Sequence, residues 1–448
     1  MASEVSGRVA SDLARSTPGA LAAAAEAYAR RNPKSLERSL AAASYLPGGN
    51  TRTSLYFDPF PLSIVRGEGC RIFDADGHEY FDFLGEFTAG VYGHSDPAIR
   101  AAIVAALNEG VNLTGHTALE AALARIICER FPSIELVRFT NSGTEANLMA
   151  LAAATALTRR RKILVFDGAY HGGVLSFARG GSPVNVPHPF VVSTYNDVDR
   201  TLELVDTHRD QLAAILIEPM IGSGGSIPAE AEFLQALRRA ATTAGALLIF
   251  DEVMTSRLAP GGRQEALGIM PDLCTLGKYL GGGMTFGAFG GRRDVMAQFD
   301  PRRPGALPHA GTFNNNVVTM AAGIAGLTKV FTPAAAQALN ARGEALRGRL
   351  NALCRDRGAR FQFTGIGSLM SAHATDRPIR TPADAAAADA AVEGVFFFDL
   401  LARGVYIARK GFIALSLPIG DAEIDHFVDA VADFLDTRKH LVVERTTS

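Results

Sequence analysis

The residue around which this chain can do chemistry is Lys278, which follows an apolar run and precedes three consecutive glycines, Gly281, Gly282 and Gly283. Glycines there let other backbone or a ligand come close, and a lysine in a closed site can act through its amine. The alternative is a surface lysine in a loose turn. Residues elsewhere in the chain must decide between these two interpretations.

A second stretch, Ser142-Gly143-Thr144, stands where an apolar strand turns into a helix. Free backbone N–H groups, two hydroxyl groups and the positive end of the helix dipole together favour a phosphate. Ser142 and Glu145 also fit a capping box, so an ordinary helix start explains the same residues. From this stretch alone both interpretations stay open.

Aromatic and acidic residues follow the neighbouring apolar strands. Tyr170 stands in a glycine-flanked turn and can lie flat on a ligand ring, although a surface tyrosine is the simpler alternative. Glu218 and Asp251 each follow a very apolar strand, where carboxylates are commonly helix caps or turn formers. Helix caps or turns do not easily explain why three successive strands end in Glu218, Asp251 and Lys278.

Together these residues would supply a phosphate site, an aromatic face, a carboxylate and a lysine amine, which is the set that pyridoxal phosphate requires. Its phosphate needs a helix N-terminus, its aldehyde needs a lysine amine for a Schiff base, and its pyridine nitrogen needs an anion that keeps it protonated. The glycine run is not a G-x-G-x-x-G motif, and Gly277-Lys278 lacks the rest of a P-loop. Four widely spaced cysteines without neighbouring histidine pairs predict no metal site.

These residues need an α/β fold to bring them together. Between residues 98 and 331, short apolar strands alternate with helical stretches, which predicts a mostly parallel sheet. Ligands of such sheets bind at the carboxyl ends of the strands. The predicted strands are 136–139, 162–166, 213–217, 246–250 and a shorter run that ends at Leu276.

We predict a large cofactor-binding domain over residues 76–331 and a smaller α+β domain made from both chain ends, residues 1–75 and 332–448. The patterns that support the smaller domain are helices up to about residue 45 with a break at Asn32-Pro33, a small hairpin or meander over 63–83, a long helix from Pro333 towards 353, strands over 360–363 and 369–373, a helix over 385–402, a strand pair around Tyr406 and Ile413, and a final helix over 421–437.

Charge and hydropathy limit the class of partner. The formal net charge of -2 and the lack of a dense basic run give no reason to expect nucleic acid or an anionic membrane. The weakly polar stretch 317–327 is well short of the roughly 20 residues of a membrane span. The first thirty residues lack the pattern of a signal peptide. We therefore expect a cytoplasmic protein with small-molecule partners.

The same residues resemble a known family, the class III (subgroup II) pyridoxal-phosphate aminotransferases. The resemblance extends from about residue 40 to 435, and within the class it is strongest to the glutamate-1-semialdehyde aminomutase branch and its members that act on aromatic β-amino acids such as β-phenylalanine. The ordered motifs that carry it are 142–146, 170–172, 251–255, 277–278 with 281–283, and 311–313, and those of the branch are 47–53, 88–94, 251–260 and 313–316.

The resemblance implies a fold-type I homodimer and a role for each motif residue. Lys278 would form the Schiff base and move the proton during the reaction. Asp251 would pair with the pyridine nitrogen, supported by Glu218. Tyr170 and Val253 would cover the two faces of the ring. The phosphate would be bound by Ser142, Gly143 and Thr144, and by Thr312 from the partner subunit.

Substrate recognition depends on arginines, because the guanidinium fork binds both oxygens of a carboxylate. Arg52 stands in the loop that matches the family's carboxylate-binding arginine. A second basic position of the family falls near Arg409 and Lys410, and the alignment places it on Lys410. This departure of one residue leaves open which of the two contacts substrate.

We expect an aminotransferase that moves an amino group from a β-amino acid to an α-keto acid such as 2-oxoglutarate or pyruvate. The alternatives are a glutamate-1-semialdehyde 2,1-aminomutase, an ω-amino-acid or amine transaminase, and a non-catalytic protein that kept the cofactor fold. The segment Met284-Thr285-Phe286-Gly287 argues against the aminomutase, which typically has Leu-Pro-Val-Gly there.

Overall fold

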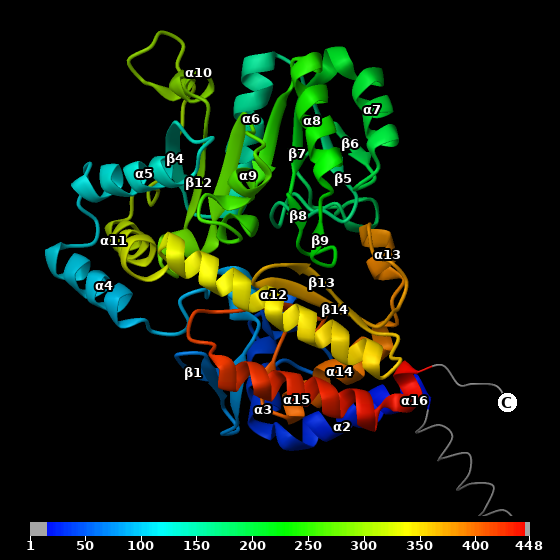
Figure 1. Cartoon of the computed structure of the whole chain (residues 1–448). Coiled ribbons are helices and arrows are strands. Elements are labelled where there is room, and N and C mark those ends of the chain that lie inside the picture. Colours follow the sequence, from blue (N-terminus) through cyan, green and yellow to red (C-terminus); the bar gives the residue numbers. More distant parts are fainter. Residues whose placement is uncertain (1–15, 444–448) are drawn as a thin grey trace, which may run out of the picture.

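The computed structural model describes residues 16–443 and contains a central seven-stranded sheet (Figure 1). The helical start expected for residues 1–15 lies outside the described residues. In the order in which they lie side by side, the strands are β4 (Leu136–Thr140), β12 (Gly287–Gly291), β11 (Leu273–Gly277), β10 (Leu247–Asp251), β7 (Leu212–Ile217), β5 (Lys162–Phe166) and β6 (Phe190–Ser193).

The sheet is parallel except for β12, which runs antiparallel to both β11 and β4. The predicted strands are confirmed, but β6 and β12 were not predicted from the sequence. Strand β12 is Gly-Ala-Phe-Gly-Gly, a composition with weak strand preference. A Cβ atom at Gly290 would lie 2.7 Å from the carbonyl oxygen of Leu136, and one at Gly291 would lie 2.2 Å from that of Asp272. The glycines are therefore required by close neighbours that only the fold creates.

Helices cover both faces of this sheet (Figure 1). Helix α6 (Gly143–Thr158) packs across β11 and β12 and is apolar on nearly every side, as expected for a helix buried between layers. The other helices of this region are α4 (Pro97–Glu109), α5 (Ala118–Arg130), α7 (Val198–Thr207), α8 (Ala231–Ala244), α9 (Gly262–Leu267), α10 (Arg293–Met296) and α11 (Val317–Ala325), and a small ladder joins β8 (Met220–Ile221) to β9 (Ile227–Pro228).

The N-terminal segment begins with two helices, α2 (Thr17–Arg31) and α3 (Pro33–Ala43), which confirms the predicted break at Asn32-Pro33. Proline fits the first turn of a helix because its missing N–H would have no partner there. The predicted meander is also confirmed. Its strands are β1 (Ile64–Glu68), β2 (Arg71–Asp74) and β3 (Glu79–Asp82), and β15 (Val405–Tyr406) adds to β3 in parallel.

The C-terminal segment starts with the long helix α12 (Pro333–Asp356), which crosses the middle of the molecule (Figure 1). One prediction was wrong: Tyr406 and Ile413 do not form a strand pair. Tyr406 lies in β15 and pairs with β3, whereas Ile413 lies in β16 and pairs with β14. The remaining elements are β13 (Gln362–Ile366), β14 (Leu369–His373), α13 (Pro382–Ala386), α14 (Ala390–Ala402), β16 (Phe412–Ala414), α15 (Asp421–Thr437) and α16 (Lys439–Val442).

Segments from both ends of the described chain lie together below the large sheet (Figure 1). Helix α14 packs against α2, and the core here contains a cluster of aromatic rings that includes Tyr28, Phe57, Phe397 and Phe398. A separate core, with Phe166 and Phe233 in edge contact, lies around the strands of the large sheet. The domain boundaries at 75/76 and 331/332 stay predictions.

No single helix between residues 16 and 443 is long and apolar enough to cross a membrane. The bent pair Val317–Val330 and Pro333–Asp356, which meet at 71°, has the required length and composition when taken together.

Substitutions at two glycines of α12 test how this helix packs against its neighbours. A Cβ atom at Gly343 would lie 2.1 Å from the carbonyl oxygen of Gly367, whereas nothing lies within 4 Å of one at Gly348. We expect Gly343→Ala to destabilise the protein by about 1–3 kcal/mol through overpacking. Gly348→Ala should stabilise it by up to about 1 kcal/mol through helix propensity. Urea unfolding of both variants checks this; equal effects would contradict the packing of α12 described above.

Candidate active site

The structure brings Glu218, Asp251 and Lys278 to one edge of the large sheet. Strands β7, β10 and β11 lie side by side and run in parallel, so their carboxyl ends meet there. Asp251 is the last residue of β10, and Glu218 and Lys278 directly follow β7 and β11. Lys278 has a φ of 55°, a left-handed conformation that a lysine rarely adopts. Such local strain is concentrated at functional sites.

The carboxylate of Asp251 is buried and held by three donors. Its Oδ2 contacts the amide nitrogen of Asn147 at 2.8 Å and the Nδ1 of His171 at 2.8 Å, and its Oδ1 accepts from the backbone N–H of Val253 at 3.0 Å. Thr275 in turn donates to the amide oxygen of Asn147 at 2.7 Å. A buried carboxylate with several hydrogen-bond donors is held in a fixed position.

Glu218 lies in the same buried region. It accepts hydrogen bonds from the backbone N–H groups of Tyr170, at 3.0 Å, and Gly222, at 3.1 Å. The pKa of Glu218 is raised to about 7, mainly by burial and also by the charge of Asp251, while His171 and the two amides act in the opposite direction. Near neutral pH this carboxyl is therefore poised between its charged and neutral forms.

Lys278 is partly buried beside these two acids. Burial lowers the pKa of the Lys278 amine to about 8; Asp251 and Glu218 oppose this shift, while Arg257 and Arg52 add to it. Among residues 16–443 no hydrogen bond involves the amine. A lysine whose pKa falls toward neutrality carries a larger fraction of the neutral amine, which is the form that attacks a carbonyl carbon.

The phosphate site predicted at Ser142, Gly143 and Thr144 lies at the start of α6, where backbone N–H groups have no partner within the helix. The Ser142 hydroxyl accepts from the N–H of Glu145 at 3.2 Å. The carboxylate of Glu145 accepts from the N–H of Asn141 at 2.9 Å, one residue earlier than a capping box requires. Only half of the predicted capping box is formed.

Glycines let the remaining parts of the site approach one another. A Cβ atom at Gly143 would lie 2.7 Å from the side chain of Val253, and one at Gly172 would lie 2.2 Å from the hydroxyl of Thr144. Val253 therefore packs on the first residue of α6, and the turn that carries Tyr170 reaches the same helix start. Tyr170 itself is exposed by 48%.

These residues fit pyridoxal phosphate. The start of α6 offers amides and hydroxyls for a phosphate, Asp251 is a fixed buried anion for a protonated ring nitrogen, and Lys278 supplies an amine without a hydrogen-bond partner in the described chain. The close approach of Gly143, Val253 and Gly277 leaves no space for a larger residue at Gly143.

Thr312 does not join this cluster within the chain. It is exposed, in a segment whose Asn314 lies 3.1 Å from the amide of Asn141, beside the helix start.

The substrate residues lie in different surroundings. Arg52 forms an ion pair with Glu86 in which both side chains are about half exposed. Arg409 is partly buried, with its guanidinium 5.8 Å and 5.9 Å from the ring centres of Phe397 and Phe398, while Lys410 is exposed. Of these three residues, Arg52 is the one whose charge contributes to the lowered pKa of Lys278.

Three residues that contribute to the site were not predicted from the sequence. Asn147 and His171 hold Asp251, and Arg257 is a fully buried arginine whose charge acts on Lys278. His171 is part of the motif that contains Tyr170, and Asn147 lies one turn into α6 on the side that faces the sheet. The place of His171 in that motif and the place of Asn147 in the helix are the sequence features from which both residues could have been predicted. Arg257 stands in the branch motif 251–260, but its burial could not be predicted, because it depends on the distant segments around Thr88 and Leu415.

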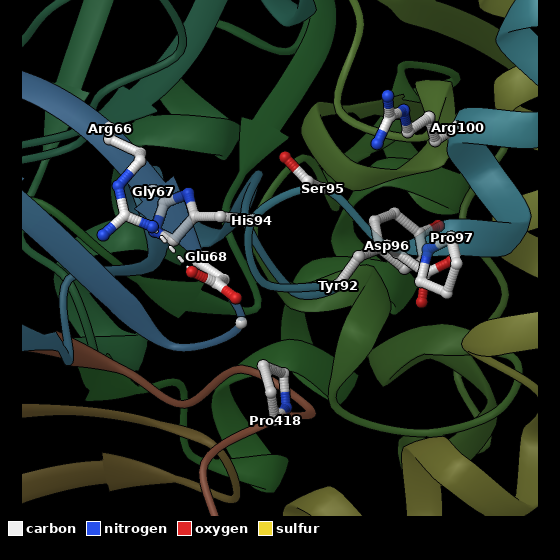
Figure 2. A pocket seen from close by; sticks show the side chains of 11 residues that line it. Arg66, Gly67, Glu68, Tyr92, His94, Ser95, Asp96, Pro97, Arg100 and Pro418 are labelled. Carbon is white, nitrogen blue, oxygen red and sulfur yellow. Dashed lines mark hydrogen bonds and ion pairs between the residues drawn. The ribbon is translucent and has the colours of Figure 1, made fainter.

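A cavity of about 450 Å³ lies elsewhere, between β1 and the start of α4 (Figure 2). Its lining includes Arg66, Glu68, His94, Asp96, Arg100 and Pro418, and none of the predicted site residues. This cavity is therefore separate from the cluster around Lys278.

Comparison with known proteins identifies the class to which this fold and site belong. The family described as Aminotransferase class-III matches residues 55–435, and the chain belongs to this family. Enzymes of this family depend on pyridoxal phosphate, so the protein is a pyridoxal-phosphate-dependent aminotransferase whose substrates are an amino donor and a keto acid. The resemblance and the fold class predicted from sequence are confirmed.

Individual relatives cover nearly the whole chain. It is 58% identical to a beta-phenylalanine transaminase of Variovorax paradoxus, over 92% of this chain and 96% of the relative. A solved beta-phenylalanine aminotransferase from Variovorax paradoxus superposes with a TM-score of 0.95 at 56% identity, over 96% of this chain and 100% of that chain. A glutamate-1-semialdehyde 2,1-aminomutase of Pelotomaculum thermopropionicum is 37% identical over 89% of this chain and 97% of the relative.

The pKa of Glu218 predicts a pH dependence of stability. In the folded chain it is about 7, above its ordinary value of 4.5. Between these pH values the folded state binds more protons than the unfolded state, so the free energy of unfolding falls as the pH rises. We expect Glu218→Gln to reduce this fall, measured by urea unfolding of the cofactor-free protein at pH 5 and pH 8. The exposed Glu232→Gln is the control and should keep the wild-type slope.

Proposed function

We propose that the enzyme transfers the amino group of an aromatic β-amino acid, such as β-phenylalanine, to an α-keto acid such as 2-oxoglutarate or pyruvate. The observation that carries the proposal is the placement of Lys278 beside Asp251 and Glu218 with Arg52 in electrostatic range of its amine, in a chain that is 58% identical to a beta-phenylalanine transaminase. A cationic side chain near the reacting amine suits a substrate that carries a carboxylate.

In this proposal each residue has a defined task. Pyridoxal phosphate, when bound, supplies an aldehyde and an electron-withdrawing ring. Lys278 provides the amine that bonds to the cofactor and carries the proton at the substrate carbon. Asp251 would pair with the protonated ring nitrogen, and Asn147 and His171, each 2.8 Å from its carboxylate, hold that carboxylate in place. Glu218 adds a second acid next to Asp251.

The remaining cofactor contacts follow from the same edge of the sheet. Ser142, Gly143 and Thr144 would bind the phosphate through the first turn of α6. Tyr170 would cover one face of the ring and Val253 the other, since Val253 packs directly on Gly143. For the substrate, Arg52 would bind the carboxylate of the amino donor. Arg409 and Lys410 stay the predicted contacts for the keto acid.

We also propose a homodimer in which Thr312 completes the phosphate site of the partner subunit. Thr312 is exposed next to Phe313, which is exposed by 57%. The side-chain amide of Asn315 donates to the carbonyl oxygen of Gly115 at 3.4 Å, so this segment adjoins the loop of Leu113, itself exposed by 49%. Large exposed apolar side chains gathered in one region are typical of a protein interface. The cytoplasmic location expected from the sequence stays a prediction.

Lys278→Ala tests the reaction. The purified variant should lose the visible absorbance change that wild-type enzyme gives on addition of β-phenylalanine, and turnover should fall by at least about 10³-fold, because the nucleophile is gone. The exposed Lys329→Ala is the control. Retained turnover in Lys278→Ala would exclude this site. Wild-type product formation that needs no keto acid would indicate an aminomutase instead.

Mixed dimers test the role of Thr312. Lys278→Ala subunits lack the amine, and we expect Thr312→Ala subunits to bind the cofactor more weakly. When the two variants are mixed, one site of each hybrid dimer contains both wild-type residues. Activity at limiting cofactor should therefore exceed the sum of the two separate variants. Activity equal to that sum would show that Thr312 does not act across the interface.

A further inference from the structure

The turn Gly85–Thr88 has an unusual backbone. Its φ angles are 51°, 49°, 49° and 83°, so three consecutive residues other than glycine, Glu86, Phe87 and Thr88, lie in the left-handed region. L-residues visit this region one at a time because Cβ then approaches the following carbonyl oxygen. A run of three persists only where the surroundings fix it, and such strain marks functional positions.

Contacts on both sides hold this turn. The carboxylate of Asp82 accepts from the N–H groups of Leu84, at 2.9 Å, and Gly85, at 3.0 Å. The fully buried Arg257 donates to the carbonyl oxygen of Thr88 at 3.5 Å. The ring of Phe87 stacks on Phe412, with centres 5.9 Å apart and planes at 20°.

This arrangement of the turn determines the position of the Glu86 side chain. Gly85 and Thr88 are buried, but Glu86 is exposed and forms an ion pair with Arg52. The contact joins Oε1 of Glu86 to Nη1 of Arg52 only. Among residues 16–443, the other guanidinium nitrogens of Arg52 make no hydrogen bond, so one edge of the fork stays available for a second carboxylate.

We propose that Glu86 is a positioning residue, which holds one nitrogen of Arg52 so that the free edge of the guanidinium can bind the carboxylate of the substrate. This inference rests on the proposed function, in which Arg52 binds that carboxylate. Neither residue touches the reacting carbon. Loss of Glu86 should therefore weaken substrate binding and leave the chemical step nearly intact.

Glu86→Ala and Glu86→Gln test the proposal in the holoenzyme. In Glu86→Ala, KM for β-phenylalanine should rise about fivefold, the upper range for a half-exposed ion pair, with kcat within about twofold of wild type. Glu86→Gln keeps an oxygen acceptor for Arg52 and should restore most of the lost affinity. An unchanged KM in Glu86→Ala, or a lower one because Glu86 competes with substrate, would overturn the proposal.

Glu86→Gly separates positioning from folding. Glycine adopts a φ of 49° without strain, so the melting temperature should equal or exceed that of wild type. KM should nevertheless rise as in Glu86→Ala. A melting temperature that falls together with affinity would indicate that the side chain only supports the fold. The control is Glu68→Ala, which removes the ion pair with Arg66 seen beside the cavity in Figure 2, and its KM should stay at the wild-type value.

Arg52→Ala distinguishes this inference from the proposed function. If Arg52→Ala raises KM strongly and Glu86→Ala does not, Arg52 binds the carboxylate without help and only the inference fails. If wild-type enzyme does not accept β-phenylalanine, the proposed function is wrong. In that case the inhibition constant of 3-phenylpropanoate, which carries the carboxylate without the amino group, is compared between wild type and the Glu86 variants. Any amino donor that the enzyme accepts serves as the substrate in this assay.

Discussion

The site depends on a buried negative charge at the end of β10. Asp251 has little access to water, and burial of a carboxylate costs several kcal/mol unless donors and a nearby cation compensate. Asn147, His171 and the N–H of Val253 supply the donors. Each comes from a different part of the sequence, so the central sheet, α6 and the turn after β5 must all be in place before Asp251 is stabilised.

The same burial sets the behaviour of the neighbouring groups. Glu218 has a raised pKa, first because burial disfavours its charged form and then because the charge of Asp251 lies nearby, while His171 acts in the opposite direction. The pKa of Lys278 falls because the amine is out of water and faces the charges of Arg257 and Arg52. A lysine whose pKa approaches neutrality is suited to accept and return a proton near pH 7.

Glycine determines how closely these groups can approach one another. Gly143 and Gly277 allow Val253 to lie against the start of α6, and Gly290 and Gly291 let β12 fit between β4 and β11. Left-handed backbone conformations also occur around the site, at Lys278 and in the turn Gly85–Thr88, which carries the ion-pair partner of Arg52. Close packing of the scaffold is therefore part of the design of the site.

The sequence by itself determined the class of the protein, most strands of the large sheet, the place of Glu218, Asp251 and Lys278 at the strand ends, and the helix start at Ser142. Short apolar strands and the residues at their ends are local signals, which is why they could be predicted. Tertiary structure decided the rest. Strand β12 depends on close neighbours rather than on strand preference, Tyr406 and Ile413 pair with different sheets, and Arg257 is buried by segments more than a hundred residues away. The Arg52–Glu86 pair likewise exists only because distant contacts hold a strained turn, and no local pattern of residues encodes that.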